Sequence, residues 1–178
     1  MKRNANLALI RAKKEGKNVQ RFYSSDLDIK SYREFILKSD LHRAISENQL
    51  RIYYQPIVRL NDNNISAAEA LLRWNHPEWG IIFPSDFIHL AEETRLIIDI
   101  ERWTLKEVCK NYCEWIKNGL PSIKVSVNFS PKQFYEENFV DDILDIINQY
   151  ELNPDFLIIE ITESTYLKNQ DTIIKNLK

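Results

Sequence analysis

The chain has 178 residues, of which 44% are hydrophobic and 28% are charged, with a formal net charge of −2. This length and composition suit one domain of ordinary size with a sizeable core. The small net charge excludes a bulk field that would draw the chain to nucleic acid or a membrane. No apolar run reaches the ~18 residues of a membrane span and no secretory signal is visible, so we expect a cytoplasmic chain without a membrane segment.

Two features of composition favour structural interpretations. Seven Lys or Arg residues oppose only Glu15 among the first 23 residues, and we interpret them as a solvated helix face rather than a nucleic-acid-binding arm. Cys109 and Cys113 lie four residues apart in a helical pattern, where few pairs meet disulfide geometry. We therefore expect reduced thiols, and no matching pair of His or Cys residues indicates a metal site with them.

The start of the chain predicts a small helix over 4–15, closed by Gly16, and a short strand over 19–23. A lone helix and strand cannot bury a core, so they look like the tail of something larger. After a polar break at 25–28, an apolar stripe predicts a helix over 31–48. This helix is interpreted as a signalling-type connector or, equally well, as a plain packing helix.

The rest of the chain alternates between strands and helices. The predicted strands span 50–56, 67–74, 123–128 and 157–161. The predicted helices comprise one beginning at Asp86 and capped by Ser85, one over 99–118, one over 130–150 with a break near Asn138, and one over 170–178. A turn at 61–64 makes the first two strands an antiparallel hairpin, and 75–84 is predicted to be a loop. The alternation that follows predicts an α/β fold with parallel strands.

The strand over 67–74 carries two charged side chains on one face. Glu69 and Arg73 share that face with Leu71, because side chains alternate along a strand. Burying either charge is costly without a partner. Four residues at about 3.3 Å each separate the two by roughly 13 Å, too far for a direct ion pair. A metal for Glu69 and a phosphate for Arg73 are natural partners, and neutralisation by other side chains is the alternative.

Three predicted strands carry a polar oxygen donor near their carboxyl ends. These donors are Glu69, Asn128 and Glu160. In a parallel α/β sheet or barrel the carboxyl ends of the strands build the site. Two carboxylates and an amide oxygen suit Mg²⁺, Mn²⁺ or Ca²⁺. Each residue alone is explained by an ordinary hydrogen bond at a strand end, but the convergence of three favours a metal site.

These residues resemble the EAL domain of cyclic di-GMP phosphodiesterases. The defining motif is matched by Glu69-Ala70-Leu71 followed by Leu72-Arg73-Trp74. Further segments that resemble the family are Tyr54-Gln55-Pro56-Ile57, Asn75-His76-Pro77-Glu78, Pro84-Ser85-Asp86-Phe87-Ile88, Val125-Ser126-Val127-Asn128-Phe129-Ser130 with Gln133, and Glu160-Ile161-Thr162-Glu163. Together these matches are far more specific than the three-letter motif.

The resemblance implies a modified TIM barrel that hydrolyses one phosphodiester bond of cyclic di-GMP to give linear pGpG. It implies Mg²⁺ or Mn²⁺ as cofactor, with inhibition by Ca²⁺. Carried over by position, the metal ligands are Glu69, Asn128 and Glu160, with Glu69 and Glu163 as catalytic residues. Glu163 is implied to hold the loop after a later strand. The implied dinucleotide contacts are Gln55, Leu72, Arg73, Pro84 and Asp86, with Arg73 near a phosphate.

The chain also departs from the family. The family's later Asp-Asp-Phe-Gly-Thr-Gly segment, which helps to bind the metals, is not in this sequence. A TIM barrel needs about 250 residues, so we expect residues 40–178 to be about the first half of the barrel and inactive on their own. Arg95 stands where the family usually has glycine.

The first residues carry a second, shorter resemblance. Residues 6–18 resemble the closing helix of a GGDEF, or diguanylate cyclase, domain, which implies that residues 1–25 are the C-terminal remnant of such a domain and residues 26–39 a helical linker. The expected partners are cyclic di-GMP, upstream GGDEF or sensor domains and a second EAL domain in a homodimer. A parent protein anchored in the membrane upstream of this chain fits the same expectation. The alternative function is a non-catalytic module that binds cyclic di-GMP or dimerises.

Overall fold

The computed structural model describes residue 9 and residues 25–130, 132–133 and 138–161. Its elements are α2 (Ser25–Ala44), β1 (Leu50–Val58), β2 (Ile65–His76), β3 (Gly80–Ile82), α3 (Pro84–Thr94), α4 (Ile97–Lys117), β4 (Lys124–Asn128), α5 (Phe139–Gln149), η2 (Pro154–Phe156) and β5 (Leu157–Glu160). Apart from Leu9, the elements predicted over 4–15, 19–23 and 170–178 lie outside the described residues.

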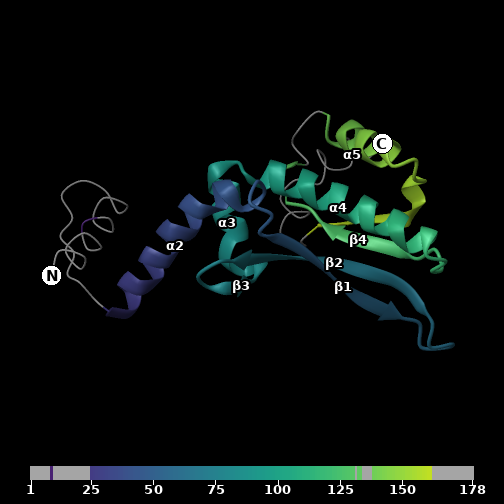
Figure 1. Ribbon diagram of the computed structural model, residues 1–178, viewed down its shortest axis with the longest axis horizontal. Coiled ribbons are helices and arrows are strands. Elements are labelled where there is room, and N and C mark those ends of the chain that lie inside the picture. Colours follow the sequence, from purple (N-terminus) through teal and green to yellow (C-terminus); the bar gives the residue numbers. More distant parts are fainter. Residues whose placement is uncertain (1–8, 10–24, 131, 134–137, 162–178) are drawn as a thin grey trace.

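The strands form one sheet in the order β1-β2-β4-β5, with β3 pairing to β2 off this path. The hairpin of β1 and β2 is antiparallel, whereas β2 with β4 and β4 with β5 are parallel. Figure 1 shows α4 and α5 lying along one face of this sheet. The arrangement confirms the predicted α/β class and forms part of a TIM-like barrel.

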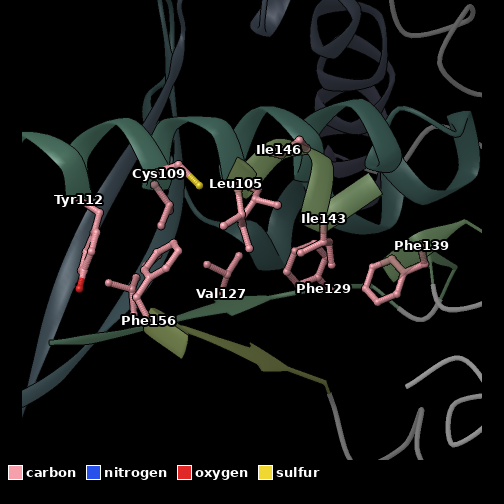
Figure 2. Close-up of a cluster of buried hydrophobic side chains, with 13 residues drawn as sticks. Leu105, Cys109, Tyr112, Val127, Phe129, Phe139, Ile143, Ile146 and Phe156 are labelled. Atoms are coloured by element: carbon pink, nitrogen blue, oxygen red, sulfur yellow. The ribbon is translucent and has the colours of Figure 1, made fainter. Parts of the chain in front are cut away.

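Helices α4 and α5 are held to the sheet by apolar stripes at helical spacing. On α5 the buried residues are Phe139, Ile143, Ile146 and Ile147, while Asp141 and Asp142 are exposed. Val125 and Val127 of β4 point into the same cluster, as Figure 2 shows for Val127 beside Leu105 and Phe129. The face of the sheet that carries the valines is therefore its core face, and the alternate residues lie on the opposite, inner face.

A second apolar cluster joins α2 and α3 to β2 and β3. Trp74 is fully buried in it and meets the ring of Phe87 edge to face. His76, also buried, stacks on Trp79, accepts the N–H of Glu78 at Nδ1 (3.1 Å) and lies 3.2 Å from Asp40 of α2 at Nε2. Nε2 therefore carries the proton and donates to Asp40. This histidine stabilises the loop.

Several boundaries differ from the sequence predictions, and the largest differences concern α2, the segment 75–84 and α3. Helix α2 begins at Ser25, so the polar break at 25–28 was wrong. The predicted loop 75–84 contains the end of β2 and the three residues of β3, joined through Gly80 at a positive φ of 65°. Helix α3 begins at Pro84 with extended Phe83 as N-cap, so the Ser85 cap was also wrong. Helix α5 begins at Phe139 with Asn138 as N-cap, which confirms the predicted break near Asn138, although Lys132 and Gln133 before it are not α-helical.

These differences have physical causes. Proline is preorganised for the first helical position, where its missing N–H is not needed, and this moves the helix start ahead of Ser85. A three-residue strand carries too little periodicity to be recognised without its partner. Polar residues such as those at 25–28 are compatible with the first turn of a helix, so composition alone does not place a helix start.

Candidate metal and phosphate site

The strand register brings the predicted polar residues onto the inner face. Gln55 of β1 pairs with Glu69 of β2, and Glu69 pairs with Ser126 of β4. Asn128, two residues further along β4, pairs with Glu160 of β5. Paired residues lie on the same face of a sheet and so do residues two apart on one strand. These five residues therefore share the face opposite the apolar core.

Asn128 and Glu69 are in direct contact across β2 and β4. Asn128 Nδ2 donates to Glu69 Oε1 at 2.9 Å. On the other side of β4, the Phe129 N–H donates to the Glu160 backbone oxygen at 3.0 Å. Glu69 lies in mid-strand because β2 continues to His76, but its pairing with β4 ends at Ala70. The side chain consequently stands where β2 and β4 part.

The donor set at this position fits a hard divalent cation. The hydrogen bond to Glu69 uses the amide nitrogen of Asn128, which leaves its Oδ1 for another partner. Carboxylate and amide oxygens are the ligands that Mg²⁺ and Mn²⁺ prefer. Among the described residues no group of three or more His, Cys, Asp or Glu side chains is placed to hold a metal ion. The three predicted ligands include only two acids, because the third is the amide of Asn128, which contacts Glu69 and is the register partner of Glu160.

Arg73 lies further along the same face of β2 as Glu69. Its Nη1 donates to the Leu72 carbonyl at 2.8 Å, and its guanidinium lies 4.8 Å from the centre of the Phe83 ring. Within the described ranges, no carboxylate oxygen lies within 4.0 Å of this guanidinium. Arg51 of β1 is its register partner. A guanidinium whose donors are not taken by a carboxylate of the described residues can bind a phosphate.

The other predicted contact residues divide into three groups. Leu72 and Pro84 line a cleft of about 620 Å³ that also borders Asn128. Asp86 forms an ion pair with Arg33 of α2 at 3.1 Å, which gives its carboxylate a partner within the protein. Glu163 lies outside the described residues.

Glu101 is a buried acid that the sequence analysis did not single out. It lies on α4, is only 5% exposed, and borders the same cleft. Its Oε1 accepts the Ser130 N–H at 2.5 Å, while its Oε2 has no partner among the described residues. Burial raises the pKa of this carboxyl to about 7, and the Ser130 N–H partly offsets that rise.

A signal for Glu101 was present in the sequence. It lies four residues from both Ile97 and Leu105, so it falls within the buried stripe of α4. An acid within an apolar helical stripe is a buried polar group that needs a partner. The partner, Ser130, lies 29 residues away, so only the fold reveals it.

Fold and site together define an α/β protein of the barrel type with carboxylate and amide side chains where the pairing of its parallel strands ends. The sequence matches the EAL domain family over residues 38–178. The chain is 36% identical over 168 residues to the bifunctional diguanylate cyclase/cyclic di-GMP phosphodiesterase MucR of Pseudomonas aeruginosa, a match that covers 94% of this chain and 24% of MucR. The chain belongs to the EAL domain family.

Two further comparisons agree. The cyclic di-GMP phosphodiesterase NbdA of Pseudomonas aeruginosa is 32% identical over 176 residues, covering 99% of this chain and 22% of NbdA. The solved structure described as the PaMucR phosphodiesterase in complex with c-di-GMP has a TM-score of 0.76 and 37% identity, covering 80% of this chain and 57% of that one. The chain thus spans about a quarter of the length of the curated relatives MucR and NbdA.

No helix among the described residues is long and apolar enough to cross a membrane.

Proposed function

We propose that this chain forms part of a cyclic di-GMP phosphodiesterase domain, which hydrolyses the cyclic dinucleotide to linear pGpG with Mg²⁺ or Mn²⁺. The contact between Asn128 and Glu69 carries the proposal, because it brings two of the three predicted ligands together from strands 59 residues apart. Glu160 is the third ligand and stands beside Asn128 in the register of β4 and β5. A bound divalent cation supplies a nucleophile at neutral pH and stabilises charge on the phosphate.

Some residues of the proposed site would hold the metal, and others would bind the dinucleotide. Glu69 would hold the metal and is proposed as a catalytic residue, and Glu163 is proposed as a catalytic residue that holds the loop after a later strand. Arg73 binds a phosphate with donors that no carboxylate among the described residues occupies, and Gln55 contacts the dinucleotide from β1. Leu72 and Pro84 offer apolar walls for a base in the cleft that they line.

Asp86 also belongs to the proposed ligand contacts. Its ion pair with Arg33 is exposed at both partners, at 45% for Arg33 and 44% for Asp86. Such a pair contributes little stability, on the order of 0–1 kcal/mol, so a ligand can displace it at small cost.

The 178-residue chain by itself is proposed to bind the dinucleotide without turning it over. Its sequence contains no Asp-Asp-Phe-Gly segment, so one proposed metal lacks a carboxylate ligand. The test incubates the purified chain with cyclic di-GMP and Mg²⁺, follows linear product by chromatography, and measures binding by calorimetry. Binding without product is expected. Linear product contradicts the inactivity of the chain, and absence of binding contradicts the proposed ligand.

A matched pair of variants separates the enzyme from the binding module. Glu69→Gln removes a proposed metal ligand, whereas Glu78→Gln changes an exposed acid beyond the end of the same strand. We expect Glu69→Gln alone to weaken Mn²⁺ binding. Equal Mn²⁺ binding by wild type and Glu69→Gln favours the alternative, a cyclic di-GMP receptor or dimerising module.

The proposal also covers the first residues of the chain and the oligomeric state. Residues 1–25 are proposed to close a GGDEF domain, with 26–39 as linker. MucR is a bifunctional diguanylate cyclase/cyclic di-GMP phosphodiesterase, which supports the presence of both kinds of domain. The sequence of the gene upstream of Met1 tests it, because a Gly-Gly-Asp-Glu-Phe segment is expected there. Dimerisation through EAL domains is proposed as well, and the oligomeric state in solution tests it.

A further inference from the structure

The two residues that follow Asn128 are held by hydrogen bonds to two different elements. The Phe129 N–H donates to the Glu160 backbone oxygen at 3.0 Å, and the Ser130 N–H donates to Glu101 Oε1 at 2.5 Å. The first bond is part of the link between β4 and β5. The second comes from a side chain of α4, on the core side of the sheet. Asn128 itself is exposed and lies just before these two anchors.

The hydrogen bond from the Ser130 N–H to Glu101 is the best-placed of the three contacts that join residues 129–133 to the helices. Lys132 Nζ reaches the Glu92 carbonyl at 2.6 Å and Gln133 Nε2 reaches the Ile98 carbonyl at 3.4 Å, but Lys132 is exposed and the second distance is long. Loss of the Glu101 carboxyl leaves a buried N–H without a partner, which costs about 1–3 kcal/mol.

We propose that Glu101 is a positioning residue: its buried carboxyl fixes the backbone at Phe129 and Ser130 and so holds the Asn128 amide beside Glu69. The inference rests on the proposed function, in which Asn128 is a metal ligand. Groups that orient metal ligands from behind affect metal affinity by about 10–100-fold. Glu101 acts through the backbone at Ser130, to which its carboxyl is bonded.

The test compares three variants of the full chain. Glu101→Gln keeps an oxygen that can accept the Ser130 N–H, Glu101→Ala removes the acceptor, and Glu114→Ala removes an exposed acid from the same helix as a control. Mn²⁺ affinity is measured by calorimetry on samples whose helix content matches wild type by circular dichroism. Glu101→Ala is expected to weaken Mn²⁺ binding by about 10-fold or more, with Glu101→Gln within about threefold of wild type.

A second readout needs no metal. The side-chain amide of Asn128, assigned by its loss in Asn128→Asp, is followed by NMR. In Glu101→Ala its signals are expected to move toward those of a solvated amide, whereas Glu101→Gln and Glu114→Ala leave them in place. If Glu101→Ala does not fold, Glu101→Asp takes its role, because the carboxyl then ends one methylene short of the Ser130 N–H.

The outcomes separate this inference from the proposed function. The positioning role is overturned if Glu101→Ala, or Glu101→Asp in its place, binds Mn²⁺ with wild-type affinity and leaves the Asn128 signals unchanged. This result leaves the proposed function intact. A wild-type chain that binds no Mn²⁺ contradicts the proposed metal site, and the Asn128 signals then decide alone whether Glu101 positions the amide.

Discussion

Glu101 should make the stability of the protein depend on pH in a defined direction. Its pKa is about 7 in the folded chain against 4.5 for an exposed glutamate. The folded state therefore binds the proton more tightly, and this contribution to stability is present below pH 4.5 and is lost as the pH rises through 7. The difference in pKa corresponds to about 3 kcal/mol as an upper bound.

The measurement is urea denaturation of wild type and Glu101→Gln at acid and alkaline pH. Glutamine does not titrate, so the variant should gain stability relative to wild type as the pH increases from about 5 to about 8. Using the difference between the two proteins cancels every other titrating group. A difference in unfolding free energy that stays constant with pH would contradict the raised pKa.

The two cysteines should differ sharply in reactivity. Cys109 is fully buried, and burial raises the pKa of its thiol to about 12. Cys113 is only partly buried, and both thiols are free. Because the thiolate is the reactive form, iodoacetamide at about pH 8 should label Cys113 and spare Cys109 in the native chain. Peptide mass spectrometry identifies the site, and urea should equalise the two. Rapid native labelling of Cys109 would be inconsistent with its burial.

At the scale of elements, the C-terminus of α3 stores backbone strain at Arg95. This residue has a φ of 62° and a ψ of 8°, the left-handed conformation that closes a helix, and its N–H reaches the Glu92 carbonyl at 3.4 Å. Side chains with a Cβ adopt this region at a cost, whereas glycine does not. The structure thus explains why glycine suits this position in the family.

Arg95→Gly should therefore stabilise the chain by about 0.5–1 kcal/mol in urea denaturation, since the relief of strain exceeds the added entropy of the unfolded state. The matched control is Arg95→Ala, which removes the same long side chain but keeps the Cβ. Equal stability of the two variants would show that the arginine side chain, and not the backbone, sets the effect.

At the scale of the whole molecule, the inner face presents apolar side chains to solvent. Tyr53, Ile57 and Ile81 share this face and are about half exposed, at 51%, 46% and 51%. Among the described residues β1 has a strand on one side only, which leaves an edge available for pairing. Exposed edges and apolar faces favour association. The isolated chain should therefore self-associate, as expected for a homodimer or for a partial barrel.

Size-exclusion chromatography with light scattering tests this expectation. Ile57→Lys places a charge on the inner face near the β1 edge and should shift the chain toward monomer. Ile116→Lys, on the exposed side of α4, is the control and should leave association unchanged. A wild-type chain that stays monomeric at high concentration and melts cooperatively would contradict the prediction.

Much of the molecule follows from local pattern. Alternation along β4 places Asn128 opposite the valines, and the stripe of α5 fixes its buried side. These patterns can be recognised in a sequence because each element has a fixed period in every protein, two residues for a strand and about 3.6 residues for a helix. The separation of Glu69 from Arg73 follows from the same geometry, and Arg73 accordingly stacks on Phe83 instead of pairing with Glu69.

What the amino-acid sequence determined by itself was the α/β class, the inner face of each strand and the set of oxygen donors on it. Only the tertiary structure decided the contact of Asn128 with Glu69, the pairing of Asp86 with Arg33, and the anchoring of Ser130 by Glu101. The physical reason is that facing direction depends on the neighbouring few residues, whereas the partner of a polar group comes from elements 29 to 59 residues away.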